Sequence, residues 1–184
     1  MKKWEILEKK DVSPSKWFPV IQHKVKLPDG TIVDDYFLSP MGSVVMVLAI
    51  TAQNEIVLVK QYKHGLGETV IELPAGFQQK GKSLEESALA ELEEEVGIKT
   101  TSDNLVFLGK VANNPTKTYH ITYGYIAMNL DFNSQQNLEI TEDIEILKLP
   151  PQEVLRMIHH GEIWVADSIA MIMKAFFHYP NIFK

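Results

Sequence analysis

The stretch Gly76–Ile98 decides the fold, and its sequence is GFQQKGKSLEESALAELEEEVGI. After an opening loop, Ser83 offers a side-chain oxygen for a helix N-cap, and Glu86 follows at the spacing of a capping box. No Gly or Pro interrupts residues 84–96, where the strong helix formers Leu, Ala and Glu predominate. Gly97 stands where helices commonly end. The stretch therefore predicts a loop followed by a helix over residues 84–96.

This helix has two distinct faces. An apolar stripe at helical spacing comprises Leu84, Ala88, Leu92 and Val96. Another face carries Glu91, Glu94 and Glu95, which crowd together because residues three and four apart are neighbours on a helix. Unpaired carboxylates repel, but a hard cation such as Mg²⁺ placed between them would turn the repulsion into attraction. The residues alone leave two interpretations open, a metal site or a solvated acidic face.

The spacing of the whole stretch resembles the Nudix box, Gly-x5-Glu-x7-Arg-Glu-U-x-Glu-Glu-x-Gly-U, in which U is a bulky aliphatic residue. Seven of the nine specified positions match, namely Gly76, Glu91, Leu92, Glu94, Glu95, Gly97 and Ile98. Lys82 replaces the first Glu of the pattern, and Ala90 replaces the Arg. In the family this Arg helps to orient the metal-binding carboxylates, so the resemblance implies that Glu94 or Glu95 is less constrained in this chain.

Length and composition limit the classes of protein to consider. The chain has 184 residues, of which 45% are hydrophobic and 23% charged, as in an ordinary globular protein. The net charge of −6 argues against nucleic acid as the main partner. The chain has no cysteine, and its longest apolar run, Val44–Ile50, is too short to cross a membrane. The N-terminus lacks the apolar core of a signal peptide, so we expect a cytoplasmic protein without a membrane partner.

The pattern of apolar residues predicts an N-terminal β extension over residues 1–40 and a main domain over residues 41–184. In the extension we expect strands over 4–7, 17–27 and 31–38, with a turn at Pro28-Asp29-Gly30. In the main domain the predicted strands cover 44–51, 56–62, 70–73, 105–111, 119–128 and 144–149. Two further helices are predicted, one from Pro150 and one capped by Asp167 or Ser168. This order predicts an α/β (α+β) fold with α/β/α layers around a mixed sheet, as the Nudix resemblance also implies.

The resemblance extends to the ADP-ribose pyrophosphatase branch of the family. It rests on the extension with its Pro-Asp-Gly turn, on Val59-Lys60-Gln61-Tyr62, and on Glu72-Leu73-Pro74-Ala75-Gly76. Proteins of this branch use the extension to build an intertwined homodimer and to stack adenine on an aromatic residue. Trp17 is the first candidate for this stacking and Tyr36 the second. Trp17 has an alternative role, in which it packs at a sheet or dimer seam.

The resemblance also implies contacts around the diphosphate. Lys63 stands where the branch usually has Arg; it can contact a phosphate but lacks the guanidinium fork. Glu72 matches a residue that hydrogen-bonds the ligand or a metal-bound water, and Gly76 is placed with these substrate contacts. The main-chain carbonyl of Ala75 matches a metal ligand, which joins Glu91, Glu94 and Glu95 in the predicted metal set.

A catalytic base is expected outside the box, on the loop before the strand 144–149. Glu142 is the first choice and Glu139 the reserve, with a solvated acidic loop as the alternative. The box residues Glu94 and Glu95 complete the predicted catalytic set. His64 and His120 could touch a phosphate, or they are ordinary surface histidines.

The predicted function is hydrolysis of a nucleoside diphosphate linked to another moiety, with Mg²⁺ as cofactor and Mn²⁺ as a possible substitute. ADP-ribose is the leading substrate and would give AMP and ribose 5-phosphate. One alternative, motivated by Lys82 and Ala90, is a weakly active or inactive domain that binds a nucleotide for regulation. Another is the same chemistry on a different nucleotide sugar, a dinucleoside polyphosphate or a coenzyme.

Overall fold

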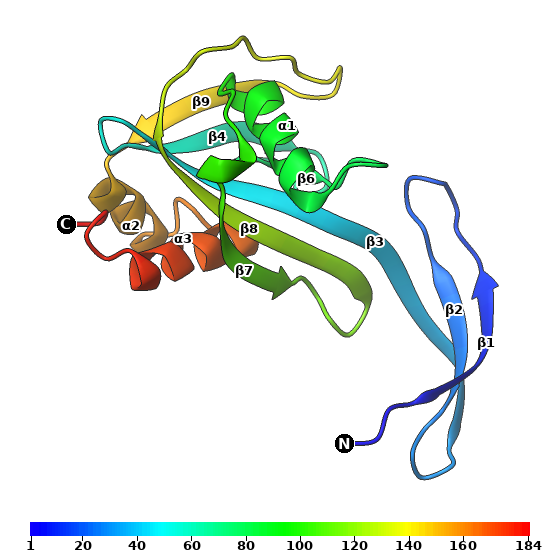
Figure 1. The fold of residues 1–184 in the computed structure, drawn as a ribbon. Coiled ribbons are helices and arrows are strands. Elements are labelled where there is room, and N and C mark those ends of the chain that lie inside the picture. The colour runs from blue at the N-terminus through cyan, green and yellow to red at the C-terminus, as the bar shows by residue number, and fades with distance from the viewer. The chain divides into compact units, whose positions relative to one another are not determined.

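The computed structural model describes all residues from 1 to 184. It divides into two compact units, one formed by residues 1–43 and 112–121 and the other by residues 44–111 and 122–184. The elements in chain order, labelled in Figure 1, are β1 (Glu5–Asp11), β2 (Ile21–Lys26), β3 (Ile32–Thr51), β4 (Ile56–Lys63), β5 (Glu68–Glu72), β6 (Ala75–Phe77), α1 (Leu84–Val96), a short 3₁₀ helix (Ser102–Asn104), β7 (Val106–Ala112), β8 (Thr118–Leu130), β9 (Ile144–Leu149), α2 (Pro151–His159) and α3 (Ala166–His178).

The first unit is built on an antiparallel arrangement of β1, β2 and the first part of β3. The predicted turn between β2 and β3 forms, with the Gly30 N–H donating to the Leu27 carbonyl at 2.9 Å and Gly30 at a φ of +92°. The predicted strand over 17–27 is too long, because β2 begins only at Ile21. Trp17 instead lies in a tight turn, which the Phe18 N–H closes by donating to the Ser15 carbonyl at 3.1 Å.

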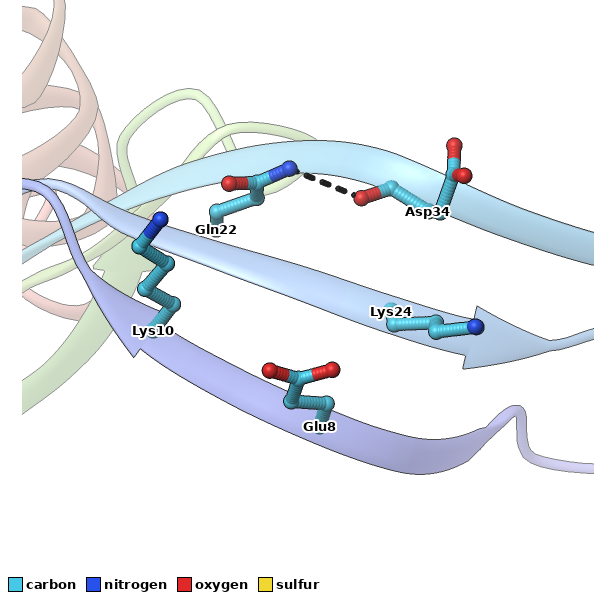
Figure 2. Close-up of a pocket in the computed structure, with 5 residues that line it drawn as sticks. All are labelled: Glu8, Lys10, Gln22, Lys24 and Asp34. Atoms are coloured by element: carbon cyan, nitrogen blue, oxygen red, sulfur yellow. Dashed lines mark hydrogen bonds between the residues drawn. The ribbon is translucent and has the colours of Figure 1, made fainter.

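One face of this small sheet is polar. Figure 2 shows the residues that line a hollow on this face, namely Glu8, Lys10, Gln22, Lys24 and Asp34. Acidic and basic side chains alternate across the hollow, and the Gln22 side-chain amide donates to the Asp34 main-chain carbonyl at 2.9 Å. Among the residues of β1 and β2, only His23 and Val25 are buried. The sheet of the first unit therefore has almost no core of its own.

The second unit is organised around β4, which pairs antiparallel with β3, β5 and β9. β6, just before the box loop, pairs antiparallel with β3, and Val45 lies opposite Gly76. Instead of the two separate strands predicted over 31–38 and 44–51, the structure has the single strand β3 of 20 residues. The prediction left residues 39–43 outside both strands, but the extended backbone continues through them, with Gly42 at a φ of +94°.

Alternation along β3 gives this unit two apolar layers. Met46, Leu48 and Ile50 belong to one buried cluster, whereas Val45, Val47 and Ala49 belong to the other. The first cluster includes side chains of α2 and α3, and the second includes side chains of α1. Figure 1 shows the same arrangement, with α1 on one side of the central strands and α2 and α3 on the other. The predicted α/β/α sandwich is thereby confirmed. None of its helices is long and apolar enough to span a membrane.

The start of α3 differs from the prediction. The helix begins at Ala166, its N-cap position is Val165, and no side chain caps it. Asp167 and Ser168, the predicted caps, are used elsewhere. The Asp167 carboxylate accepts from the Thr122 hydroxyl at 3.0 Å, and the buried Ser168 hydroxyl accepts from the Leu73 N–H at 3.1 Å. Tertiary hydrogen bonds have thus taken the polar groups that local sequence assigned to capping.

Candidate active site

The box helix forms as the sequence predicts and is fixed at both ends. At its N-terminus the Ser83 hydroxyl accepts from the Glu86 N–H at 3.1 Å, and the Glu86 carboxylate accepts from the Ser83 N–H at 2.7 Å. At its C-terminus Gly97 has a left-handed φ of +70°. Ala88, Leu92 and Val96 are buried in the core beneath the helix. The acidic edge of α1 therefore belongs to a helix that is capped at both ends and packed on the core.

The loop between β8 and β9 is fastened to the end of α1. The Asn137 N–H donates to the Glu94 carbonyl at 2.9 Å, and the Gln136 side-chain amide donates to the Glu95 carbonyl at 2.7 Å. The Ser134 N–H donates to the Gly97 carbonyl at 3.0 Å. These donors satisfy carbonyl groups that a helix end leaves without partners. They also bring the acidic part of this loop, residues 139–142, toward the box.

Gly76 leaves the space that Glu91 occupies. A β-carbon at position 76 would lie only 2.3 Å from the carboxyl carbon of Glu91 and from its Oε2 atom. Any side chain at this position would have to displace the carboxylate. The glycine of the box therefore serves a specific purpose here, which is to let a carboxylate of α1 lie against the loop backbone.

Glu95 is the most deeply buried acid of the site, with 2% of its surface exposed. Its Oε2 accepts from the Ala75 N–H at 2.9 Å. Burial, assisted by the negative charges of Glu91 and Glu142, raises the pKa of Glu95 to about 8 against the opposing effects of the Ala75 hydrogen bond and of Lys63. Burial likewise raises the pKa of Glu91 to about 7, assisted by the neighbouring charge of Glu94. Both carboxylates thus lack sufficient positive charge nearby.

Gln79, which the sequence analysis did not single out, lies at the same edge. Its side-chain amide donates to Oε2 of Glu94 at 3.3 Å and to Oε1 of Glu91 at 3.5 Å. A glutamine in a loop carries no signal in a single sequence, so only the folded arrangement reveals it.

Lys63, Glu72 and Gln61 form a group across β4 and β5. The Lys63 ammonium lies 2.8 Å from Oε1 of Glu72, and the Gln61 amide donates to the same oxygen at 2.9 Å. Glu72 is 7% exposed. Because the charge of Lys63 also lowers the pKa of Glu95, this group adjoins the acidic edge of α1.

The two acids of the β8–β9 loop contribute unequally. Glu142 is half-buried and Glu139 is exposed. The charge of Glu142 raises the pKa of both Glu91 and Glu95, whereas Glu139 contributes only to Glu91. The Glu142 carboxylate also accepts from the Glu139 N–H at 2.9 Å, which holds it in place. Of the two predicted bases, Glu142 therefore acts on both of these box carboxylates, and Glu139 acts only on Glu91.

The two aromatic candidates, Trp17 and Tyr36, belong to the first unit. Trp17 is 80% exposed, with the Lys16 ammonium 4.7 Å from its ring centre. The Tyr36 hydroxyl donates to the Thr116 carbonyl, and its ring packs edge-on against Trp4 at 5.5 Å between centroids. The contacts of Trp17 and Tyr36 are therefore made within the first unit, whereas the acidic edge of α1 belongs to the second.

The two departures from the box have different surroundings. Lys82 is exposed; hydrogen bonds with Ser83 are the main cause that lowers the pKa of the capping residue Glu86, and the charge of Lys82 is the least. Lys82 is not among the causes that shift the pKa of Glu91 or Glu95. Ala90 is half-buried and offers no polar atom. Neither residue therefore supplies the orienting charge that the Nudix pattern places at position 90.

The donor groups suit a hard divalent cation in chemistry. No three acidic or histidine side chains converge as a finished metal cage. However, Glu91, Glu94 and Glu95 offer carboxylate oxygens, the ligands that Mg²⁺ prefers. The raised pKa values of Glu91 and Glu95 show that negative charge is poorly compensated there. A bound cation would relieve this imbalance.

An acidic helix edge behind a glycine loop, set on an α/β/α sandwich, is the arrangement of a Nudix hydrolase. The NUDIX domain model matches residues 40–168, about two thirds of the chain, and the chain belongs to this family. A second model, described as the nucleoside diphosphate sugar hydrolase N-terminal domain, matches residues 4–39.

Similar proteins agree with this assignment. The chain is 28% identical over 163 residues to an ADP-ribose pyrophosphatase of Bacillus subtilis (strain 168), covering 88% of this chain and 86% of that protein. It is 30% identical over 149 residues to a methanol dehydrogenase activator of Bacillus methanolicus, covering 80% and 79%. A solved structure of an ADP compounds hydrolase has a TM-score of 0.86 at 21% identity, covering 98% of this chain and 96% of that chain, and supports the fold.

Proposed function

We propose that this Nudix hydrolase cleaves the diphosphate of ADP-ribose with the help of Mg²⁺, giving AMP and ribose 5-phosphate. Mn²⁺ is the expected substitute metal. The Bacillus subtilis relative, which is named an ADP-ribose pyrophosphatase, supports this choice of substrate. One water is consumed, and the bond broken is the anhydride between the two phosphorus atoms.

The observation that carries the proposal is the pair of neighbouring carboxylates formed by half-buried Glu91 and buried Glu95. Burial and neighbouring negative charge raise the pKa of both groups. Such an arrangement destabilises the metal-free protein, and perturbed pKa values of this kind cluster at functional sites. We assign Glu91, Glu94, Glu95 and the Ala75 carbonyl to the metal, which would supply Lewis-acid stabilisation of the diphosphate charge.

Other residues of the second unit would handle the substrate and the proton. We assign Glu142 as the general base that takes the proton of the attacking water, because its charge acts on both Glu91 and Glu95. Lys63 would give up its ion pair with Glu72 and bind a phosphate oxygen instead. Glu72 would remain held by Gln61 and accept a hydrogen bond from the ligand.

The first unit would bind adenine and a second subunit. Large apolar side chains remain exposed there, namely Trp4, Ile6, Leu7, Trp17, Phe18, Ile32 and Phe37. This is more than a small sheet with little core can leave in water without a partner. We therefore propose that residues 1–40 pack in a homodimer, with Trp17, or in second place Tyr36, stacking on the adenine.

A product-resolved assay tests the proposal. Purified protein is incubated with Mg²⁺ or Mn²⁺ and with ADP-ribose, other nucleotide sugars, dinucleoside polyphosphates and nucleotide coenzymes. We expect AMP and ribose 5-phosphate in equal amounts, with ADP-ribose as the best substrate. Better turnover of another compound would move the assignment to that substrate. Binding of ADP-ribose without turnover of any compound would support a regulatory nucleotide-binding domain instead.

The assembly is tested separately by light scattering at micromolar concentration. A homodimer is expected, and Trp17→Ala should weaken binding of ADP-ribose without changing the turnover number greatly. A monomer would contradict the proposed role of residues 1–40.

A further inference from the structure

Gln79 lies between the two carboxylates at the loop side of the box. Its Nε2 atom donates to Oε2 of Glu94 at 3.3 Å and to Oε1 of Glu91 at 3.5 Å. A side-chain amide has two N–H groups, so it can serve two acceptors at once. Each bond uses one oxygen of its carboxylate, and the other oxygen of each group stays available for a cation.

The backbone of Gln79 is held independently of its side chain. The Gln79 N–H donates to the hydroxyl of Ser87 at 3.1 Å, and the Ser87 hydroxyl donates to the Ser83 carbonyl at 2.8 Å. Ser87 is fully buried in α1. The helix that carries the two carboxylates therefore also fixes the loop residue that contacts them. Truncation of the Gln79 side chain leaves this anchor in place.

Neither Lys82 nor Ala90 supplies the orienting group that the Nudix pattern places at position 90. Lys82 is exposed and acts on Glu86, and Ala90 has no polar atom. Gln79 is a polar side chain that reaches both Glu91 and Glu94 from outside the helix. We propose that Gln79 is the positioning residue that orients Glu91 and Glu94 for a divalent cation, in place of a side chain at position 90. This inference rests on the proposed function, because it assumes that the two acids bind metal.

The amide suits this task because it is neutral. It restrains two like-charged groups without cancelling the negative charge that attracts the cation. An arginine at position 90 would lie one helical turn before Glu94 and could restrain it from the helix itself. Gln79 and an arginine at position 90 would therefore be alternative solutions, and their effects should not be additive.

The test measures Mn²⁺ affinity by electron paramagnetic resonance, without substrate. Gln79→Ala should weaken Mn²⁺ binding about 10-fold, in the range found for residues that orient metal ligands. Gln78→Ala is the matched control. It removes the same side chain from the neighbouring position, where Gln78 is exposed and donates to the Lys82 carbonyl at 3.1 Å. Its Mn²⁺ affinity should equal that of the wild type.

A second variant tests the exchange of roles. In an Ala90→Arg background, Gln79→Ala should lose clearly less Mn²⁺ affinity than it does alone. An equal loss in both backgrounds would overturn the idea that Gln79 replaces a side chain at position 90. Unchanged Mn²⁺ affinity in Gln79→Ala, in a wild type that binds Mn²⁺, would overturn the inference and leave the proposed function standing. A wild type that binds no Mn²⁺ would contradict both.

Discussion

Two groups of glutamates on the same helix have opposite surroundings. Glu86 caps α1, and its hydrogen bonds with Ser83 lower its pKa, while Glu93 pairs with Lys99 at 3.1 Å. Of the other two, Glu95 is buried and Glu91 half-buried, and burial raises the pKa of both. We call the first pair the structural glutamates and the second pair, Glu91 and Glu95, the edge glutamates. A negative charge on α1 is therefore not a site by itself. The candidate site lies where the carboxylates have too little positive charge nearby.

The difference has an energetic consequence. The structural glutamates stabilise the fold in their charged form, because each has a hydrogen bond or a cation near it. The edge glutamates destabilise the fold in their charged form unless a cation is bound. The charge that would bind a cation therefore lowers stability at Glu91 and Glu95, whereas the charge of Glu86 and Glu93 raises it. Variants of the two pairs can separate the two effects.

The largest effect is expected at the proposed base. Glu142→Gln should cut the rate of ADP-ribose hydrolysis by about 10²–10⁴-fold, the usual contribution of a positioned general base, while metal binding changes little. Glu139→Gln shares the loop and the charge and serves as the control in the same steady-state assay. A greater loss in Glu139→Gln than in Glu142→Gln would show that we chose the wrong carboxylate.

The two box glycines, Gly97 and Gly76, should differ as the two pairs of glutamates do, one affecting stability and the other metal binding. Gly97→Ala places a β-carbon 2.6 Å from the Ser134 carbonyl oxygen at a φ of +70°, so it should lower stability by about 1–3 kcal/mol. Gly76→Ala meets only the flexible carboxylate of Glu91. It should weaken Mn²⁺ binding by about 10-fold or more while stability changes by less than about 1 kcal/mol. Chemical denaturation and Mn²⁺ titration of both variants measure this, and loss of folding in Gly76→Ala would contradict it.

The metal-free protein should lose stability as pH rises. The folded pKa of Glu91 is about 7 and that of Glu95 about 8, both above the ordinary value of 4.5. The unfolded chain therefore releases these protons at lower pH than the folded chain, and the destabilisation develops between about pH 4.5 and 8. Glu91→Gln should accordingly raise the melting temperature in chelator at pH 8 more than at pH 5. Glu93→Gln should show no such pH-dependent gain, and an equal gain for Glu91→Gln at both pH values would oppose the account.

The smallest effect is expected at the helix cap. Ser83→Ala removes the hydroxyl that accepts from the Glu86 N–H and should lower stability by about 1 kcal/mol. Metal affinity should remain that of the wild type, because the cap lies at the opposite end of the helix from Glu95. Chemical denaturation measures the stability, and Mn²⁺ titration measures the metal affinity. A loss of metal affinity together with stability would contradict the distinction between the two groups of glutamates.

Local sequence predicted those elements whose signals are local. Ser83, Glu86 and Gly97 determined the bounds of α1, and alternating apolar residues located β4, β8 and β9 closely. The prediction failed where tertiary structure overrode local preference. Residues 39–43 lay outside the two predicted strands, yet β3 passes through them, and Asp167 is bonded to Thr122 instead of capping α3.

The site was predictable where the box pattern covers it and hidden elsewhere. The spacing alone placed Gly76 and the acids of α1. The contact of Gln79 with Glu91 spans 12 positions and joins a loop to a helix, so no periodicity reveals it. The same holds for Gln136, whose amide reaches the Glu95 carbonyl across 41 positions.

The central claim, that the edge glutamates Glu91 and Glu95 bind the metal, is tested most directly by calorimetric titration with Mn²⁺ and Mg²⁺. The comparison is between Glu95→Gln and Glu93→Gln, two variants that carry the same substitution in the same turn of α1. The account predicts binding in the wild type, an unchanged affinity in Glu93→Gln, and a loss of about 10-fold or more in Glu95→Gln. Equal affinities in the two variants, or a wild type that takes up neither metal, would contradict it.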